Sequence, residues 1–526
     1  MPGPTRADGY TELEYPGFGK GLNLRDQPNV VGPDQALDAL NVIFTSRGGV
    51  QQRPGYLKFT DAEGTNAYDS LGVYYTSSGT KQLLAGAGNR LEGLATDGTI
   101  VDSDATPTAS PHFFARFGGP TNELAFAGNG TDELFQWDGS TWTHPTWTTE
   151  TPTGKFVAVT PWDNRLINAR FDGSTAGDNP STVRFAEPND PLDFGTNNYE
   201  DLLPGDGEEI MGVCAWREFV FVFKESKFFV FYGTHSDESG NPVFDYRPVD
   251  TGIGAVASRG IAVGRDGVYF LARTGVYRTV GGEPMLISDD LDGVFAQQSG
   301  VAPPFYSGAV ISNAHIEDAA LEWWDERVYV AVPTNNAYND RTFVFDTRYQ
   351  WWSVYDLPIA AMVRFRVSND EELLFAYSTG TQDIGRHRQS DSDDDGTEIV
   401  SFCNYGWTDD GIPQQHVLRA MKLWGKGTLT VAVAVDFQTA AGGDVVDFSI
   451  GADTWGDGTG ADNWGDGSDS SDVWSSGVIL NGKYIPHAYK GSVFSLQLSS
   501  QGGEPWAIYR GSKLLRDIET PTRIGS

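Results

Sequence analysis

The chain has 526 residues and a formal net charge of −34 at pH 7, with 71 acidic residues against 37 lysines and arginines. This charge excludes a standing attraction to DNA phosphates or anionic membranes unless a basic face exists locally. The length exceeds what one hydrophobic core usually serves, and 63 glycines, 27 prolines and 13% aromatic residues indicate many short strands joined by tight turns, without long helices.

Neither a membrane segment nor a disulfide framework is expected. The first ten residues, MPGPTRADGY, lack the basic and apolar regions of a secretory signal, and the most apolar stretch, residues 218–232, is interrupted by four polar residues. Cys214 and Cys403 lie far apart in the sequence, so we expect two buried thiols that act as small hydrophobic side chains.

The first predicted elements lie in residues 21–56, GLNLRDQPNVVGPDQALDALNVIFTSRGGVQQRPGY. Pro33 and the residues after it predict a short turn of helix. A strand, a turn at Gly48 and Gly49, and a second strand that ends at a Pro-Gly pair should follow. We therefore expect residues 1–60 to form an N-terminal arm with a hairpin that lies over something larger.

Similar strand-turn-strand units follow the arm at intervals of about 40 to 50 residues, without a copied motif. The units begin at Leu71, Phe113, Gly154, Met211, Ile253 and Ala320, with an optional seventh at Met362. This period is typical of propeller blades. The sequence thus predicts an all-β protein in which residues 61–390 form a β-propeller of about six or seven irregular blades.

The composition changes near residue 390, and residues 391–526 predict a C-terminal β-sandwich-like domain because their last strands alternate apolar and polar residues. Residues 451–476 form an acidic Gly/Asp/Trp loop that cannot bury a core of its own. Its Trp455, Trp464 and Trp474 could anchor it in a partner's pockets, its turns could bind a cation, or it could be a solvated insertion whose tryptophans pack back on the domain.

Two groups of motifs resemble tail nozzle or tail hub proteins of short-tailed bacteriophages. The first is the segment 21–56, which contains the sequence GLN followed by Asp26 and then the sequences PDQA and DALNV. It ends with an RGGV turn followed by RPGY. The second is a series of blade-like segments: WDNRLINAR with VRFAEPNDPLDF, then FVFVFKESKFFVFYG, then GVYFLARTGVYRTVGG. Each motif occurs in other propellers, but their order along the chain is more specific.

This resemblance implies a non-enzymatic structural protein of the virion tail, made in the host cytoplasm and needing no cofactor. It implies a homo-oligomer, a hexameric ring, bound to a tail adaptor protein above and to tail fibre or tip proteins. The ring would retain the viral DNA and then let it pass without specific binding. A net charge of −34 suits such a channel because cationic contacts would make DNA stick, although acidity also serves solubility and saline habitats.

A closed ring needs two different complementary faces on each subunit, and the sequence does not locate them. We place the candidate docking residues in the N-terminal arm and in the tryptophan loop. They are Leu22, Leu24, Arg25, Asp26, Arg47, Arg53, Tyr56, Trp455, Trp464 and Trp474. We expect a chain that lacks the arm to fold as a monomer that fails to join particles.

One acidic segment imitates a calcium loop. Asp391, Asp393 and Asp395 have the spacing of its first half, but Phe402 stands where a bidentate glutamate is needed. A charged turn between two domains is the commoner origin of such a run.

Other chemistry has little support in the sequence. Ser392, Asp394 and Gly396 approach the spacing of a sialidase-type Asp box, with Ile399 in place of the expected aromatic residue. Gly-x-Ser-x-Gly, His-Glu-x-x-His and Walker motifs do not occur. With 71 acidic residues, carboxylate pairs do not identify a glycosidase. The triplet 364–366, Arg-Phe-Arg, puts both arginines on one face of a strand, which favours pairing with acidic residues over nucleic-acid binding.

Two other classes of protein stay open. One is a host-surface propeller that binds or cleaves glycans, as part of a tail fibre, a spike or a secreted protein. The other is a cellular scaffold propeller with protein partners, which the lack of regular repeats disfavours.

Overall fold

The computed structural model describes residues 6–7, 10–15, 17–60, 67–118, 123–147, 158–169, 180–195, 198–236, 242–295, 303–334, 336–367, 370–378, 383–387, 392–409, 415–438, 440, 443–448, 481–501 and 505–517. They form two compact units. Unit 1 holds Met1–Arg53, Pro304–Tyr306 and Gly396–Ser526, and unit 2 holds Pro54–Pro303 and Ser307–Asp395.

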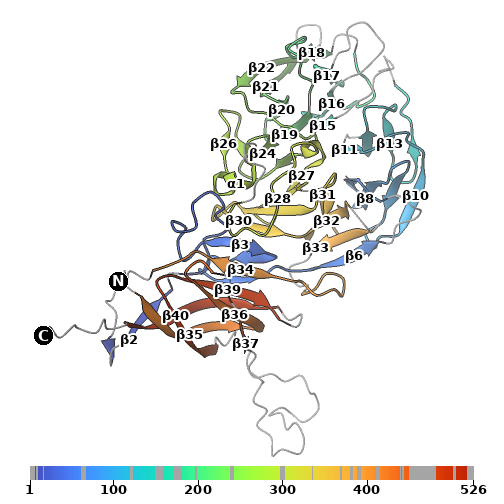
Figure 1. The fold of residues 1–526 in the computed structure, drawn as a ribbon. Coiled ribbons are helices and arrows are strands. Elements are labelled where there is room, and N and C mark those ends of the chain that lie inside the picture. Colours follow the sequence, from blue (N-terminus) through green and yellow to red (C-terminus); the bar gives the residue numbers. More distant parts are fainter. Residues whose placement is uncertain are drawn as a thin grey trace, which may run out of the picture. The chain divides into compact units, whose positions relative to one another are not determined.

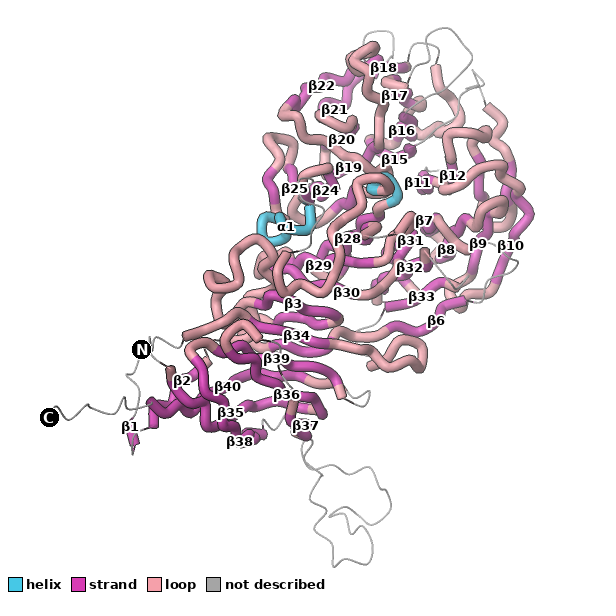
Figure 2. Tube along the Cα trace, viewed as in Figure 1, coloured by secondary structure: helices cyan, strands magenta, loops and turns pink. Residues whose placement is uncertain are grey.

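The described residues are almost entirely strand and loop (Figure 2). Their helices are one short α-helix and two 3-10 turns: α1 (Asp292–Phe295), η1 (Asp289–Leu291) and η2 (Ile316–Asp318). Within this part of the chain no helix is long and apolar enough to cross a membrane.

The described residues of unit 2 form a β-propeller of seven four-stranded antiparallel sheets (Figure 1). The first sheet contains β7 (Ser70–Tyr75), β8 (Lys81–Gly86), β9 (Leu91–Leu94) and β10 (Ile100–Ala105). The second contains β11 (Phe113–Gly118), β12 (Glu123–Gly128), β13 (Phe135–Trp137) and β14 (Trp142–Thr143). The third contains β15 (Ala158–Trp162), β16 (Arg165–Ala169), β17 (Thr182–Phe185) and β18 (Tyr199–Asp201). The fourth contains β19 (Gly212–Trp216), β20 (Phe219–Phe223), β21 (Lys227–Ser236) and β22 (Pro242–Asp250). The fifth contains β23 (Ile261–Val263), β24 (Val268–Ala272), β25 (Gly275–Thr279) and β26 (Met285–Leu286). The sixth contains β27 (Ala320–Trp324), β28 (Arg327–Val332), β29 (Arg341–Asp346) and β30 (Trp351–Tyr355). The seventh is β31 (Ile359–Arg366), β32 (Glu371–Tyr377), β33 (Ile384–His387) and β6 (Tyr56–Thr60).

The ring of blades is closed. The first strand of each sheet contacts the first strand of the next, from β7 through β11, β15, β19, β23 and β27 to β31, and β31 contacts β7. The predicted propeller is therefore confirmed, with seven blades, and the optional unit that begins at Met362 is one of them.

The seventh blade takes its outer strand from the other end of the chain. Strand β6 pairs with β33, with Tyr56 opposite His387 and Thr60 opposite Ile384. The sequence-based division after residue 60 therefore falls one strand too late, because a ring is closed by pairing an early segment of the chain with a late one. Gly55, just before β6, runs so close to Asp393 that a Cβ atom there would lie 1.8 Å from its carbonyl oxygen.

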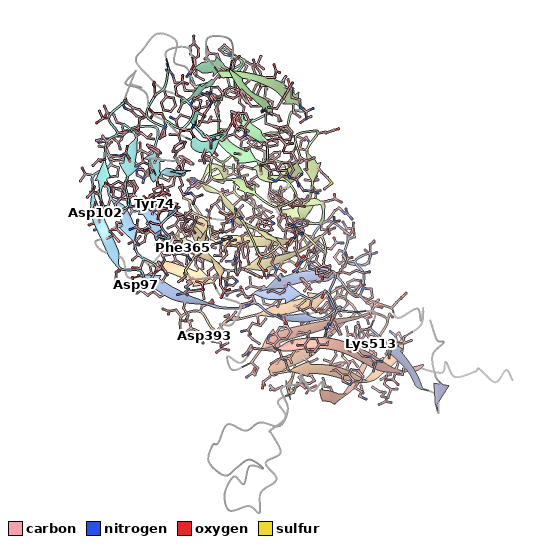
Figure 3. All side chains as sticks on the ribbon, turned by 180° about the vertical axis from the view of Figure 1, so that it is seen from behind. Tyr74, Asp97, Asp102, Phe365, Asp393 and Lys513 are labelled. Atoms are coloured by element: carbon pink, nitrogen blue, oxygen red, sulfur yellow. The ribbon has the colours of Figure 1, made fainter. Side chains whose placement is uncertain are left out.

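The middle strands of the blades are buried on both faces, since each sheet is stacked between two others. Strand β20 reads FVFVF and β28 reads RVYVAV, which are nearly continuous apolar runs, as expected for strands covered on both sides. The seam between the seventh and first blades is closed by Phe59, Leu83 and Phe365, and Phe365 is fully buried (Figure 3).

Asp-Gly turns end the outer hairpins of the first two blades. Gly98 has a φ of +84°, a conformation that glycine adopts at little cost. The carboxylate of Asp97 accepts hydrogen bonds from the amide and hydroxyl of Thr99 at 3.1 and 2.6 Å. Asp97 and Asp102 lie along the outer edge of the propeller (Figure 3), where Asp102 accepts a bond from the amide of Trp142 in the second blade.

The part of unit 1 that the structure describes forms two sheets, in agreement with the expected β-sandwich-like domain. One contains β1 (Arg6–Ala7), β2 (Tyr10–Glu14), β40 (Ala507–Asp517), β35 (His416–Lys426) and β38 (Asn481–Gly491), with β4 (Val42–Phe44) and β5 (Val50–Gln52) joined through β40. The other contains β3 (Ala36–Leu40), β34 (Phe402–Tyr405), β39 (Phe494–Ser500), β36 (Thr428–Val435) and β37 (Asp444–Asp447).

The N-terminal segment belongs to these sheets and is not a separate arm. Strand β2 pairs with β40 and β3 pairs with β34, while Phe18 is fully buried and packs edge-on against Tyr405 with ring centroids 5.3 Å apart. The expected helix at Pro33 is a turn, closed by a hydrogen bond from the Gln35 amide to the Gly32 carbonyl. The predicted hairpin does form, from β4 and β5.

Candidate functional site

A cavity of about 200 Å³ lies where the first strands of the propeller approach one another. Its polar lining consists of Ser70, His112, Ser258, Arg259 and Glu322, among apolar residues such as Leu71, Val213 and Met362. Glu322 is the only carboxylate among the described residues that line it. These lining residues therefore do not provide the two facing carboxyl groups that glycoside hydrolysis uses.

Arg259 ties several blades together beside this cavity. Its Nη1 donates hydrogen bonds to the main-chain carbonyls of Asp69 and Ala360 at 2.7 and 3.0 Å, and its Nη2 donates to that of Asp318 at 3.4 Å. Burial lowers the pKa of Arg259, while the charges of Asp69 and Asp318 act against that shift. Because three segments before or within the first, sixth and seventh blades depend on one guanidinium, we assign Arg259 a structural role.

Ser70 and His112 do not form an activated nucleophile. The Ser70 hydroxyl donates to the carboxylate of Asp69 and accepts from the main-chain amide of His112, so it is not bonded to the imidazole. Burial lowers the pKa of His112, which favours a neutral ring. Its Nδ1 has no hydrogen-bond partner among the described residues.

A second hollow, of about 530 Å³, opens at the ends of the first strands of blades one, two and seven. We call it the basic pocket, because its lining includes Lys81, Arg116, Arg364 and Arg366 and a single carboxylate, Glu371. Val73, Tyr75, Thr76, Gly79 and Thr80 complete the lining. In a chain with almost twice as many acidic as basic residues, this is a local inversion of charge.

The arginines of the basic pocket are held in different ways. Arg364 pairs with Glu322 at 3.1 Å and lies over the Trp323 ring, and Arg366 pairs with Glu371 at 3.5 Å. Because Arg366 and Glu371 are opposite each other on β31 and β32, the expected cross-strand pairing with acidic residues is confirmed for Arg366. Arg364 instead reaches an acidic residue of the neighbouring blade.

Arg116 differs from these two. Its guanidinium lies 5.4 Å from the centre of the Tyr75 ring, it is exposed, and it forms no ion pair with any described carboxylate. Burial raises the pKa of Tyr75, so the phenol stays neutral beside it, and the Tyr75 hydroxyl accepts a hydrogen bond from the Arg366 amide at 3.0 Å.

The calcium candidates hold the edge of the seventh blade. The Asp393 carbonyl accepts from the Tyr56 amide at 3.1 Å and the Asp395 amide donates to the Tyr56 carbonyl at 2.8 Å. The carboxylate of Asp395 also accepts from the amide of Lys58. Asp391 lies outside the described residues. The segment thus pairs with β6, which gives it a structural explanation that needs no ion.

A different set of residues gathers in the manner of metal ligands. Among the described residues, the ligand atoms of His315, Glu317 and Asp318 lie within 4.8 Å of one another. Burial raises the pKa of Asp318, and nothing else at this turn indicates an ion.

The candidate docking residues of the N-terminal segment divide into buried and exposed groups. Leu22, Leu24 and Arg53 are 1%, 4% and 1% exposed, so their side chains belong to the core of unit 1 and do not present a docking surface. Arg53 donates to the Asn41 side chain at 2.8 Å. The ring of Tyr56 packs edge-on against two aromatic residues of the seventh blade.

The other N-terminal candidates are accessible. Arg25 and Asp26 form an ion pair at 3.1 Å, and hydrogen bonds from Arg25 and Asn23 lower the pKa of Asp26. Arg47 is exposed at the tip of the hairpin. Trp455, Trp464 and Trp474 lie outside the described residues.

The basic pocket was not predicted from the sequence. Its cations come from positions 81, 116, 364 and 366, which only the closure of the ring brings together. The one available signal was the Arg-Phe-Arg triplet, which reveals a basic strand face but not its neighbours.

Comparisons with known proteins identify no family for this chain. No family model matches the chain, and no curated protein matches it. Among solved structures it is similar to BBS1N in complex with ARL6DN: a mercury-soaked crystal aligns with a TM-score of 0.39 at 10% identity, and a lead-soaked crystal with a TM-score of 0.38 at 12% identity. Each alignment covers 64% of this chain and 98% of the matched chain. A likeness of this degree carries no inference about partners or activity, and the propeller is established by its seven sheets.

Proposed function

We propose that this chain is a structural virion protein of a tailed virus and forms the tail nozzle or hub, the ring through which the genome is retained and ejected. The observation that carries the proposal is the order of motifs along the chain: residues 21–56, then the blade segments at 162–170, 219–233 and 267–282. A propeller joined to a second β unit is the architecture that this order implies. The protein would act by assembly and not by catalysis.

The proposed partners follow from the same resemblance. Copies of the chain form a hexameric ring that meets a tail adaptor protein above and tail fibre or tip proteins elsewhere. On the N-terminal segment, Arg25, Asp26 and Arg47 are the accessible candidates for docking. A net charge of −34 keeps passing DNA from binding tightly to the channel.

Quantitative mass spectrometry of purified virus particles tests the proposal. We expect about six copies of the chain per particle, as in one closed six-fold ring. Arg47→Glu should reduce the number of copies per particle, whereas Arg273→Glu, the same change of charge at a propeller surface position, should not. Particles that contain no copy of the chain would contradict the proposal and favour a glycan-binding propeller, which a glycan array would then test.

A further inference from the structure

The basic pocket can receive an anionic group at Arg116, since its other two arginines already pair with Glu322 and Glu371. It concentrates three arginines and a lysine around one carboxylate, and Arg116 forms no ion pair with a described residue while its side chain is exposed. Guanidinium groups bind carboxylates in well-defined, charge-assisted hydrogen bonds. At about 530 Å³, the hollow has the size of a site for a compact group.

An anionic segment of suitable chemistry occurs in the chain itself. Residues 449–480 contain no lysine or arginine, and their acidic residues are Asp453, Asp457, Asp462, Asp466, Asp469 and Asp472. In the sequence the segment lies between β37 and β38 of unit 1. Half of its length, fully extended, reaches on the order of 50 Å from these strands.

We propose that the basic pocket takes the aspartate-rich segment 449–480 of a second copy of this chain. The inference rests on the proposed ring, because a closed ring is built from head-to-tail contacts between two different faces. A basic pocket on the propeller and an acidic segment from unit 1 are two such faces. The contact also offsets part of the repulsion that copies with a charge of −34 exert on one another.

The lining of the pocket suits a short acidic peptide better than duplex DNA. The cations lie in a hollow between blade ends, whereas a duplex needs a positive surface that follows its phosphates. Val73 and Tyr75 add an apolar wall, against which a tryptophan of the segment can pack.

The test is binding of a labelled peptide of residues 449–480 to the full chain, measured by fluorescence anisotropy at low salt. The receiving chain carries asparagine at the six aspartates of its own segment, so that it does not compete. We expect saturable binding that weakens as salt is raised. It should fall about tenfold or more with Arg116→Glu and stay unchanged with Arg273→Glu, a matched charge reversal in another blade. A peptide with asparagine at all six positions should not bind.

Three results would overturn the inference. The first is that the acidic peptide does not bind at low salt, and the second is that Arg116→Glu leaves the binding intact. The third is that the native chain stays monomeric while its own segment blocks the added peptide. That result would mean that the segment fills the pocket of the same copy. Circular dichroism of Arg116→Glu shows that a loss of binding is not a loss of fold. Peptide binding by a chain that is absent from virus particles would overturn the tail role and leave the contact standing.

Discussion

The propeller and unit 1 differ in how far apart in the sequence their paired strands lie. In six of the seven blades, all four strands are consecutive along the chain. In unit 1, Tyr10 pairs with Arg516 and Leu40 pairs with Phe402. Most pairs of the first kind are joined by short turns with recognisable residues, so a sequence reveals them, whereas pairs of the second kind leave no local signal.

The seventh blade combines both kinds of pairing. Its strands β31, β32 and β33 are consecutive, and β6 joins them from the beginning of the chain. If closure of the ring depends on that distant strand, changes at the seam should destabilise the propeller more than changes of similar size elsewhere.

The largest effect is expected at the apolar seam between the seventh and first blades. Phe365→Ala removes a fully buried ring that packs with Phe59 and Tyr75, and it should cost about 3–5 kcal/mol of unfolding free energy. Urea denaturation measures this change. The control, Val280→Ala, lies at a site that is 54% exposed and should change the free energy by less than about 0.5 kcal/mol. Equal effects of the two substitutions would contradict a closed seam.

A backbone contact beside β6, the outer strand of the seventh blade, should give the next largest effect. Gly55→Ala places a Cβ atom 1.8 Å from the Asp393 carbonyl oxygen, so β6 must move, and the expected loss is about 1–3 kcal/mol. Hydrogen exchange should speed up at the amides of Tyr56 and Asp395, which bond across this contact. Gly282→Ala is the control, because nothing lies within 4 Å of its added Cβ. Unchanged exchange in Gly55→Ala would show that the strand is not held there.

Loss of the hydrogen bonds that Arg259 donates to several blades should have an effect of similar size. Arg259→Met keeps most of the side-chain volume but leaves the carbonyls of Asp69 and Ala360 without their donors, at a cost of roughly 1–3 kcal/mol. Arg273→Met breaks an exposed ion pair with Glu225 and should cost less than about 1 kcal/mol. Thermal unfolding of both variants compares them, and similar melting temperatures would argue against the tie.

The smallest effect is a pH dependence within the fourth blade. Lys224 has a fully buried side chain and pairs with Asp206 at 3.0 Å. Burial acts to raise the pKa of Asp206, but hydrogen bonds from the Glu208 amide and from Lys224 outweigh it, so the pKa is lowered. A lowered folded-state pKa stabilises the protein above the unfolded value of about 3.9, and that stability is lost as the pH falls through the folded value.

The corresponding measurement compares urea midpoints at about pH 7 and about pH 3. We expect Asp206→Asn to destabilise the protein near neutral pH and to reduce the difference between the two midpoints. A variant with the full pH dependence of the native chain would show that other carboxylates account for it.

The local features of the fold were predictable, and the distant ones were not. The Asp97-Gly98 turn and the apolar run of β20 led to the blades directly. Nothing near Phe59 indicates that it completes the seventh blade, and nothing near Arg53 indicates that this arginine is buried. The candidate site shows the same limit, since the cations of the basic pocket come from distant positions and are adjacent only after the ring closes.

The same limit explains why the N-terminal segment was expected to be a separate arm although it is part of unit 1. Residues 21–53 contain the strands β3, β4 and β5 and the buried Leu22 and Arg53, so removing them should unfold unit 1 and not leave a folded monomer. Surface substitutions such as Arg47→Glu are therefore the sound way to test docking.

Immunogold labelling of virus particles from the source organism, with an antibody against this chain, tests the central claim most directly. The proposed nozzle or hub predicts gold at the tail or its tip in electron micrographs. Gold elsewhere on the particle, or particles without gold, would contradict it.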